Sequence, residues 1–147
     1  MECDFDQVIF GEPASAKNRR RIVLAGGRPR LIKSAKALNY EKIFREQCNP
    51  LGELIVGDCA IWLDCYYGSR RPDLAAVDLI QDLLEGHAYK NDRQVKASAS
   101  IWNLDKENPR VRVRVKALDM VESSGLSSYT PYEIWGMDVL KAKPSDS

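Results

Sequence analysis

Residues 70–95 read RRPDLAAVDLIQDLLEGHAYKNDRQV, and this stretch decides the fold class. It joins two strand-like runs through a segment with helical spacing. Pro72 followed by Asp73 is typical of a helix start and Gly86 of a helix end, which predicts a helix from Asp73 to about Glu85. One face of this helix is apolar and the other polar: the apolar positions are Ala76, Val77, Leu79, Ile80, Leu83 and Leu84, and the polar ones are Asp78, Gln81, Asp82 and Glu85.

Strand-like segments lie on both sides of this helix in the sequence. Strands are expected at residues 5–10, 53–67, 93–102 and 110–117. Residues 21–32 predict a hairpin with a Gly-Gly turn, and Ser34 is a suitable N-cap for a helix over residues 35–48. Trp62 is expected to pack in the core. This order predicts an α+β fold, with a mostly antiparallel or mixed β-sheet and helices packed on one face.

Length and composition are those of one globular domain. The chain has 147 residues, of which 44% are hydrophobic and 29% charged. We expect residues 1–117 to form the main domain and residues 118–147 a partly flexible C-terminal extension, with a short helix or strand within residues 129–140. No apolar run reaches the length of a membrane span, and the acidic N-terminus argues against a signal peptide. The four cysteines form no C-x-x-C pair and there is one histidine. This pattern argues against a zinc site and favours an intracellular protein with reduced thiols.

Basic residues are concentrated near the N-terminus, although the net charge is only +1. Eight of them lie between Lys17 and Lys36, with no acidic residue among them. A block of one sign in a balanced chain indicates an anionic partner; the alternative is a solvated basic loop. If the partner is DNA, the candidate binding residues are Lys17, Asn18, Arg19, Arg20, Arg21, Arg28, Arg30, Lys33, Arg70 and Arg71.

Four aspartates lie on and around the predicted helix: Asp73, Asp78, Asp82 and Asp92. Asp78 and Asp82 are four residues apart and share a face, where two carboxylates repel each other unless a cation or a basic group is near. Carboxylate oxygens are the ligands that Mg²⁺ prefers, and nucleases combine them with phosphate oxygens. The alternatives are a solvated acidic face and, for Asp73, a helix N-cap.

Short motifs occur in a characteristic order along the chain. They are G-x-P-x-S-x-K-N-R at residues 11–19, R-R-P-D-L at 70–74, D-L-L-x-G at 82–86 and Y-x-N-D-R-Q-V at 89–95. Over about residues 7–117 they resemble the RusA-type Holliday junction resolvases, which are endodeoxyribonucleases of phage and bacterial origin. In the family motif D-L-D-N-x-x-K, Asp73 matches the first Asp. In the D-D-x-Q motif, Asp92 and Gln94 match the second Asp and the Gln.

The resemblance implies the activity, the cofactor and the partners. It implies a Mg²⁺-dependent homodimer that cuts four-way DNA junctions in recombination, repair or phage DNA processing. Mn²⁺ is expected to substitute for Mg²⁺. The expected location is the cytoplasm of a bacterial or phage-infected cell, and no membrane partner is expected.

The chain departs from the family pattern at Ala75 and Ala76, where the family has Asp and Asn. Two interpretations are open. In one, Asp78 replaces the missing carboxylate from one helical turn away, so that Asp73, Asp78 and Asp92 are catalytic and hold the metal, with Asp82 as an additional ligand. In the other, the protein binds branched DNA without cutting it. A small protein-binding module is a further alternative.

Overall fold

The computed structural model describes residues 3–14, 20–25, 28–118 and 131–135 of the chain. Its elements are β1 (Phe5–Phe10), β2 (Arg20–Ala25), β3 (Arg28–Lys33), α1 (Ala35–Gln47), β4 (Cys59–Tyr67), α2 (Val77–Leu83), the 3₁₀ turn η2 (Asp92–Gln94), β5 (Val95–Leu104), β6 (Arg110–Ala117) and α3 (Pro131–Trp135). None of the helices in these residues is long and apolar enough to cross a membrane.

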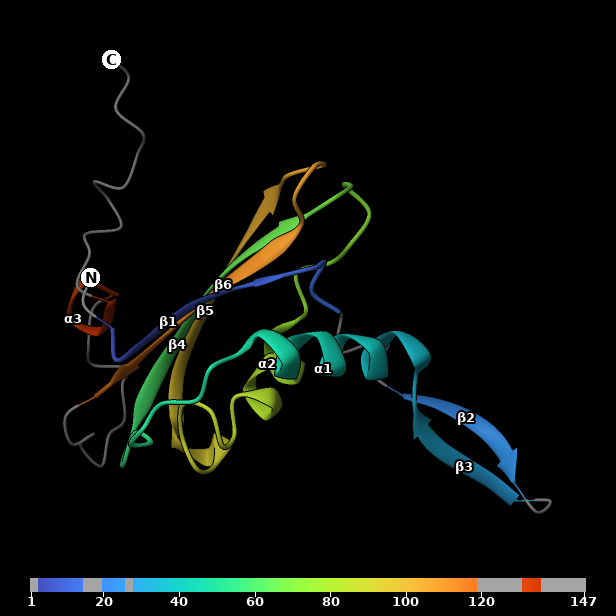
Figure 1. Ribbon diagram of the computed structural model, residues 1–147, viewed down its shortest axis with the longest axis horizontal. Helices are drawn as coiled ribbons and strands as arrows, with labels where there is room; N and C mark the ends of the chain where they lie inside the picture. Colours follow the sequence, from blue (N-terminus) through green and yellow to red (C-terminus); the bar gives the residue numbers. More distant parts are fainter. Residues whose placement is uncertain (1–2, 15–19, 26–27, 119–130, 136–147) are drawn as a thin grey trace.

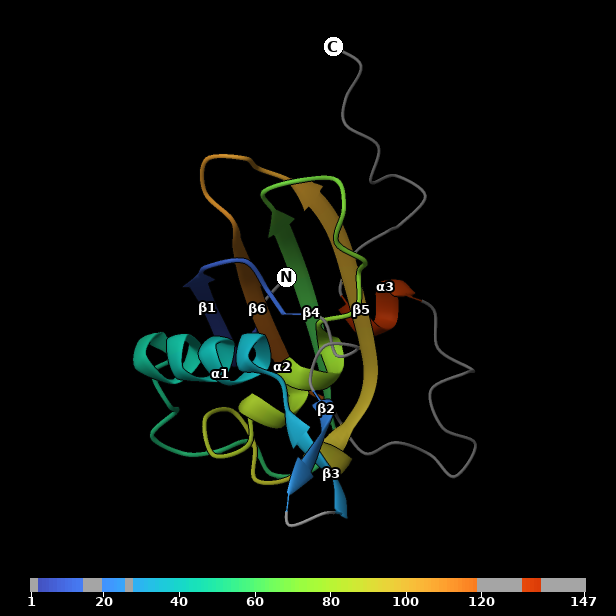
Figure 2. The ribbon, with the colours of Figure 1, turned by 90° about the vertical axis from the view of Figure 1, so that its right-hand side faces the viewer.

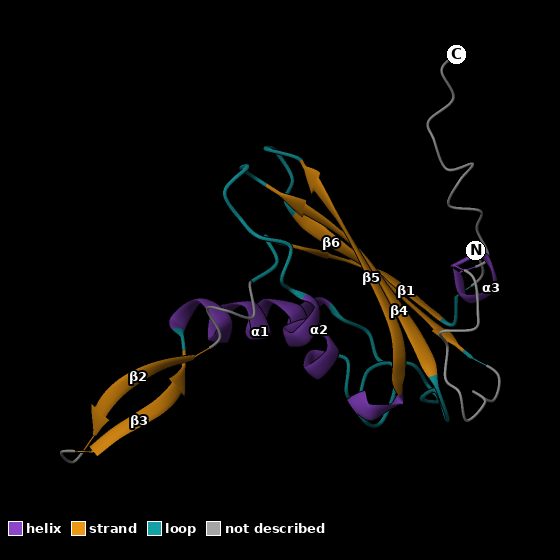
Figure 3. Cartoon of the chain, turned by 180° about the vertical axis from the view of Figure 1, so that it is seen from behind, coloured by secondary structure: helices purple, strands orange, loops and turns teal. Residues whose placement is uncertain are grey.

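Four strands form one mixed sheet in the order β1-β6-β4-β5. β6 pairs antiparallel with both β1 and β4, whereas β4 and β5 are parallel. The helices α1 and α2 lie on one side of this sheet (Figures 1, 2 and 3). The predicted α+β fold, with a mixed sheet and helices packed on one face, is therefore confirmed.

The core lies between the sheet and these two helices. From Ile61 to Tyr67 in β4 and from Val111 to Val115 in β6, every second side chain is buried against the helices. Helix α1 begins where expected, because the Ser34 hydroxyl accepts a hydrogen bond from the Ala37 amide at 3.1 Å. The main buried side chains are Ile61, Leu63, Tyr67, Val111, Val113 and Val115 from the sheet and Tyr40, Phe44, Leu79, Ile80 and Leu83 from the helices.

Two predicted boundaries are wrong. The strand expected from residue 53 begins only at Cys59, because residues 53–58 form a loop in which Ile55 bridges to Tyr89. The helix expected from Asp73 begins at Val77, and its N-cap Ala76 makes no side-chain cap bond.

The late start of α2 follows from bonds made by the loop that precedes it. The Pro72 carbonyl accepts a hydrogen bond from Trp102 Nε1 at 3.0 Å, and the Asp73 carbonyl accepts one from the Ala75 amide at 3.0 Å. Residues 72–75 are therefore held as a turn over the sheet, and Asp73 is not the N-cap.

The expected core position of Trp62 is also wrong. Trp62 alternates with the buried Ile61 and Leu63, so the pleat turns its side chain to the opposite face of the sheet. There its ring meets Trp135 of α3 edge to face at a centroid distance of 5.2 Å, and Trp62 Nε1 donates to Asp64 Oδ1 at 3.1 Å. Helix α3, which lies beyond the predicted domain boundary at residue 117, thus packs on the outer face. The boundary itself stays a prediction.

The arginines of β6 also lie on this outer face, and each has a carboxylate partner. Arg110 pairs with Asp105 at 2.8 Å, Arg112 with Asp6 at 2.7 Å and Arg114 with Asp64 at 2.6 Å. Despite its RVRVRVK sequence, β6 therefore does not present unneutralised arginines to an anionic partner.

The strands β2 and β3 form a separate two-stranded ribbon, as predicted, and its Gly-Gly turn lies outside the described residues. The ribbon projects beyond α1 on the side away from the sheet (Figures 1 and 3). Its register places Arg21 opposite Ile32, Val23 opposite Arg30 and Ala25 opposite Arg28.

The packing of α3 gives the first testable prediction. Trp135 is only 6% exposed. Its replacement by alanine should lower the free energy of unfolding by about 3 kcal/mol, the low end for truncating a buried aromatic side chain. Chemical denaturation followed by circular dichroism measures this. The control Leu38→Ala alters an apolar side chain that is 51% exposed and should cost about 0.5 kcal/mol or less. Equal losses in the two variants would show that α3 does not pack on the sheet.

Candidate active site

The turn that follows α2 returns the chain to the C-terminal end of that helix. The Ala88 amide donates to the Leu84 carbonyl at 2.9 Å, and the Gly86 amide donates to the Tyr89 carbonyl at 2.8 Å. Gly86 has a φ of 84°, a left-handed conformation that glycine adopts without strain. The hydroxyl of the buried Tyr89 then donates to the Gln81 carbonyl at 2.7 Å. The end of α2, the turn and the start of η2 are thus held together.

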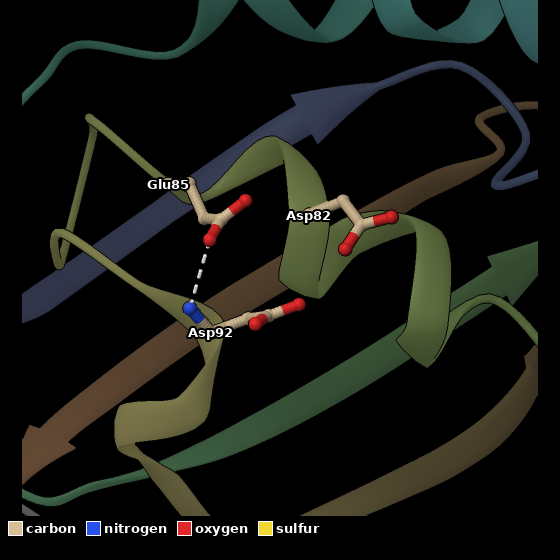
Figure 4. Close-up of side chains that lie close together, drawn as sticks. All are labelled: Asp82, Glu85 and Asp92. Atoms are coloured by element: carbon tan, nitrogen blue, oxygen red, sulfur yellow. Dashed lines mark hydrogen bonds between the residues drawn. The ribbon is translucent and has the colours of Figure 1, made fainter.

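This arrangement brings three carboxylates close to one another. Asp82, Glu85 and Asp92, which we call the acidic group, each offer an oxygen within 4.8 Å of the other two. Figure 4 shows the three side chains directed to a common space beside the end of α2. Glu85 Oε2 also accepts a hydrogen bond from the Asp92 amide at 2.9 Å. Asp82 and Asp92 are half-buried and Glu85 is exposed, so the group is accessible to ligands.

The neighbouring groups raise the pKa of Asp92 above its usual value. A hydrogen bond with Asp82 is the largest cause that raises the pKa of Asp92, followed by partial burial and by the negative charges of Glu85 and Asp82; Arg93 opposes the shift. Burial also raises the pKa of Tyr89, and all three carboxylates add to that effect. A cation placed among the carboxylates would relieve the repulsion.

The donor set fits a hard divalent cation. Three carboxylates supply oxygen ligands, which Mg²⁺ and Mn²⁺ accept, and water or phosphate oxygens can complete an octahedral shell. The described residues place no cysteine or histidine among these three donors. Mg²⁺ or Mn²⁺ therefore suits this site better than a thiolate-preferring metal.

Of the four predicted metal ligands, the structure brings together Asp82 and Asp92. Asp78 is exposed in the first turn of α2, and neither it nor Asp73 belongs to the acidic group. Asp73 lies in the loop after β4, where its charge and that of Glu12 are among the smaller causes that raise the pKa of Tyr67, burial being the largest. Asp73 and Asp92 therefore lie on opposite sides of α2 in the sequence.

Glu85 is the member of the acidic group that the sequence did not single out. It follows Asp82 by three residues, a spacing that places two side chains on the same side of a helix. The sequence feature that could have identified Glu85 as a candidate ligand was its position on the polar face of the predicted helix. The sequence did not show that the turn at Gly86 returns Asp92 to this end of α2.

The predicted DNA-binding residues fall into three places. Arg70 and Arg71 are exposed in the loop that follows β4. Arg20, Arg21, Arg28, Arg30 and Lys33 belong to the β2–β3 ribbon. Lys17, Asn18 and Arg19 lie outside the described residues.

The fold and the site together define the class of protein. An α+β domain with an accessible acidic group and a projecting ribbon rich in arginine has the parts expected of an endodeoxyribonuclease, a hydrolase that cuts DNA within a strand. Comparison with known families agrees. Residues 11–116 match the family described as Endodeoxyribonuclease RusA, and the chain belongs to that family.

Family membership confirms the resemblance seen in the sequence and implies Holliday junction resolvase activity in general. The family acts on branched DNA. A search of curated proteins finds no match to the chain.

The raised pKa of Asp92 gives a prediction about stability without metal. The folded protein binds the Asp92 proton more tightly than the unfolded chain, where the pKa is near 3.8. The contribution of Asp92 to stability is therefore greatest below pH 3.8 and is lost as pH rises through its folded pKa. In metal-free protein at pH 7, Asp92→Asn should melt at a higher temperature than wild type. Scanning calorimetry from pH 4 to pH 8 measures the difference.

Divalent cations should reverse the order of these two melting temperatures, because they stabilise the wild type and not Asp92→Asn. At a hundred times the dissociation constant, binding adds about 2.7 kcal/mol to the free energy of unfolding. Glu107→Gln is the control, because Glu107 is an exposed carboxylate in the loop between β5 and β6, outside the acidic group, and this variant should still respond to the cation. An Asp92→Asn protein that gains as much stability from Mn²⁺ as wild type would contradict the assignment.

Proposed function

We propose that this protein is a Mg²⁺-dependent, structure-selective endonuclease that resolves four-way junctions and other branched DNA. It acts as a homodimer in recombination, repair or phage DNA processing, in the cytoplasm of a bacterial or phage-infected cell, and Mn²⁺ substitutes for Mg²⁺. The observation that carries the proposal is the convergence of Asp82, Glu85 and Asp92 in a chain of the RusA family.

In this proposal the acidic group holds the cation. When bound there, a divalent cation neutralises charge on the scissile phosphate and supplies a nucleophile near neutral pH. Asp92 and Asp82 share a hydrogen bond that raises the pKa of Asp92, so cation binding displaces any proton held between them. The Asp92 amide orients the Glu85 side chain by donating a hydrogen bond to Glu85 Oε2. In this proposal Glu85 Oε1 binds the cation.

In this proposal Glu85 replaces the second carboxylate of the family motif, which is missing at Ala75. With Glu85, the acidic group has three carboxylates without Asp78 or Asp73. The roles of Asp73 and Asp78 as catalytic residues and metal ligands stay predictions from the sequence, and the same experiments test them.

DNA would be held by the basic residues outside the acidic group. The β2–β3 ribbon carries four arginines and a lysine on strands that extend away from the domain, and a two-stranded ribbon can follow a groove of DNA. Arg70 and Arg71 offer exposed charges on the loop after β4. A homodimer would present two ribbons and two acidic groups, which suits the two-fold symmetry of a four-way junction. Light scattering in solution tests the dimer.

Binding without cleavage is the second candidate function, because Ala75 and Ala76 replace the family's Asp and Asn. Incubation of labelled four-way junctions with protein in Mg²⁺ or Mn²⁺ separates the two candidates. Paired nicks support the nuclease. Tight binding with no nicks in either metal would leave only the binding function.

A series of carboxylate variants tests which residues hold the metal. Asp92→Asn and Glu85→Gln should each lower junction cleavage by at least about 100-fold, since even residues that only orient metal ligands cost up to that factor. Binding of the junction in Ca²⁺ should stay near the wild-type level. Asp73→Asn and Asp78→Asn go through the same assay. If Asp78→Asn abolishes cleavage and Glu85→Gln does not, Asp78 rather than Glu85 replaces the missing carboxylate.

Salt dependence of binding tests the role of the ribbon. A basic side chain that neutralises one DNA phosphate adds about 0.9 to the steepness of log affinity against log salt. Replacing Arg21, Arg28 and Arg30 by glutamine should therefore flatten the slope by up to about 2.7. Arg112→Gln is the control, because Arg112 is paired with Asp6 on the outer face. A triple variant with the wild-type slope would show that the ribbon does not bind DNA.

A further inference from the structure

The side chain of Gln94, the last residue of η2, makes four hydrogen bonds. Its Oε1 accepts from the amides of Lys90 at 3.1 Å and Asn91 at 3.0 Å. Its Nε2 donates to the carbonyls of Ile55 and Gly57, each at 2.8 Å. A glutamine amide has two N–H groups and two carbonyl lone pairs, so every hydrogen-bonding position of this side chain is used.

These bonds join segments that are distant in the sequence. Residues 55–57 belong to the loop before β4, whereas residues 90–94 end the crossover from α2 to β5. The loop is itself anchored, because Ile55 is buried and its amide donates to the Ala88 carbonyl at 2.9 Å. Gln94 therefore attaches the start of η2 to a fixed part of the domain.

Asp92 lies in the sequence between Asn91, whose amide is bound by Gln94, and Gln94 itself. On one side, the Asn91 amide is bound by Gln94 and the Asn91 side chain accepts from the Arg93 amide at 2.9 Å. On the other side, Gln94 leads directly into β5. With its neighbours held in this way, the Asp92 amide meets Glu85 Oε2 at 2.9 Å. The four bonds of the Gln94 side chain go to backbone groups and not to a carboxylate of the acidic group.

We propose that Gln94 is a positioning residue of the active site, which fixes Asp92 beside Glu85 and Asp82 and acts through Asp92 alone. The proposal rests on the proposed function in one respect, namely that the acidic group holds the cation. When a metal-ligating side chain is not held in place, ordering it on cation binding costs free energy and lowers the affinity. Loss of Gln94 therefore weakens cation binding without removing a ligand.

The chain supplies a matched control in Gln47. Its Oε1 accepts from the Phe10 amide and its Nε2 donates to the Phe10 carbonyl, each at 2.8 Å, so it too fastens backbone by paired amide bonds. These bonds join α1 to the edge strand β1 and involve no residue of the acidic group. Gln47→Met measures what the loss of such bonds does to the fold alone.

The experiment compares Gln94→Met, Gln94→Asn and Gln47→Met with wild type, using two readouts that do not involve DNA cleavage. Electron paramagnetic resonance of free Mn²⁺ gives the affinity for the cation. Hydrogen exchange by NMR on metal-free protein gives the protection of the Asp92 amide. We expect both Gln94 variants to bind Mn²⁺ about 10–100-fold more weakly and to exchange the Asp92 amide about tenfold faster. Gln47→Met should lower the melting temperature and leave both readouts unchanged.

Each outcome decides the proposal. Asp92 protection that stays at the wild-type level in the Gln94 variants overturns it, whether or not the metal binds. Reduced protection with unchanged Mn²⁺ affinity also overturns it, because Gln94 would then be structural only. A wild-type protein that binds no Mn²⁺ refutes the proposed metal dependence instead, and the exchange rates of the Asp92 amide then decide whether Gln94 positions Asp92. If Gln94→Met does not fold, the milder Gln94→Asn supplies the comparison.

Discussion

The parallel pairing of β4 with β5 is the constraint on which the rest of the structure depends. Parallel strands cannot be joined by a tight turn, so the chain after Tyr67 must return to the other end of the sheet before it enters Val95. The return path contains α2, the turn at Gly86 and η2. Because α2 buries its apolar face on the sheet, the polar side of its last turn faces outward just before the chain reaches β5. Asp82, Glu85 and Asp92 meet there for that reason.

Charge in this protein is distributed by the fold rather than by composition. A net charge of +1 gives little general attraction to DNA, so binding must depend on local groups. The arginines of β6 are pairwise neutralised by Asp105, Asp6 and Asp64 on the outer face, which also receives Trp135. In the sequence, the basic residues that remain concentrated without acidic neighbours are those of the ribbon and of the segment before it.

The sequence predicted the elements whose pattern is local. The strands expected at residues 5–10 and 110–117 are β1 and β6, and the expected Ser34 cap begins α1, because backbone geometry and side-chain period alone determine these features. It mispredicted the start of α2 and the side of Trp62, because both depend on distant partners. Trp102 binds the Pro72 carbonyl, and Trp135 covers Trp62. Two of the three members of the acidic group, Asp82 and Asp92, were predicted as ligands. Their convergence with Glu85 was not, because it depends on the turn at Gly86, which the sequence pattern does not specify.

Packing also limits which side chains position 76 can hold. Ala76 is 2% exposed and belongs to the core between the sheet and the helices. A charged aspartate side chain there would lose most of its hydration, which costs several kcal/mol unless a group such as an amide at the start of α2 binds it. With α2 beginning at Val77, the Ala76 side chain is part of the packed core. The proposed acidic group is accordingly formed by residues further along the crossover, with Asp82 on the last turn of α2 and Glu85 and Asp92 after it.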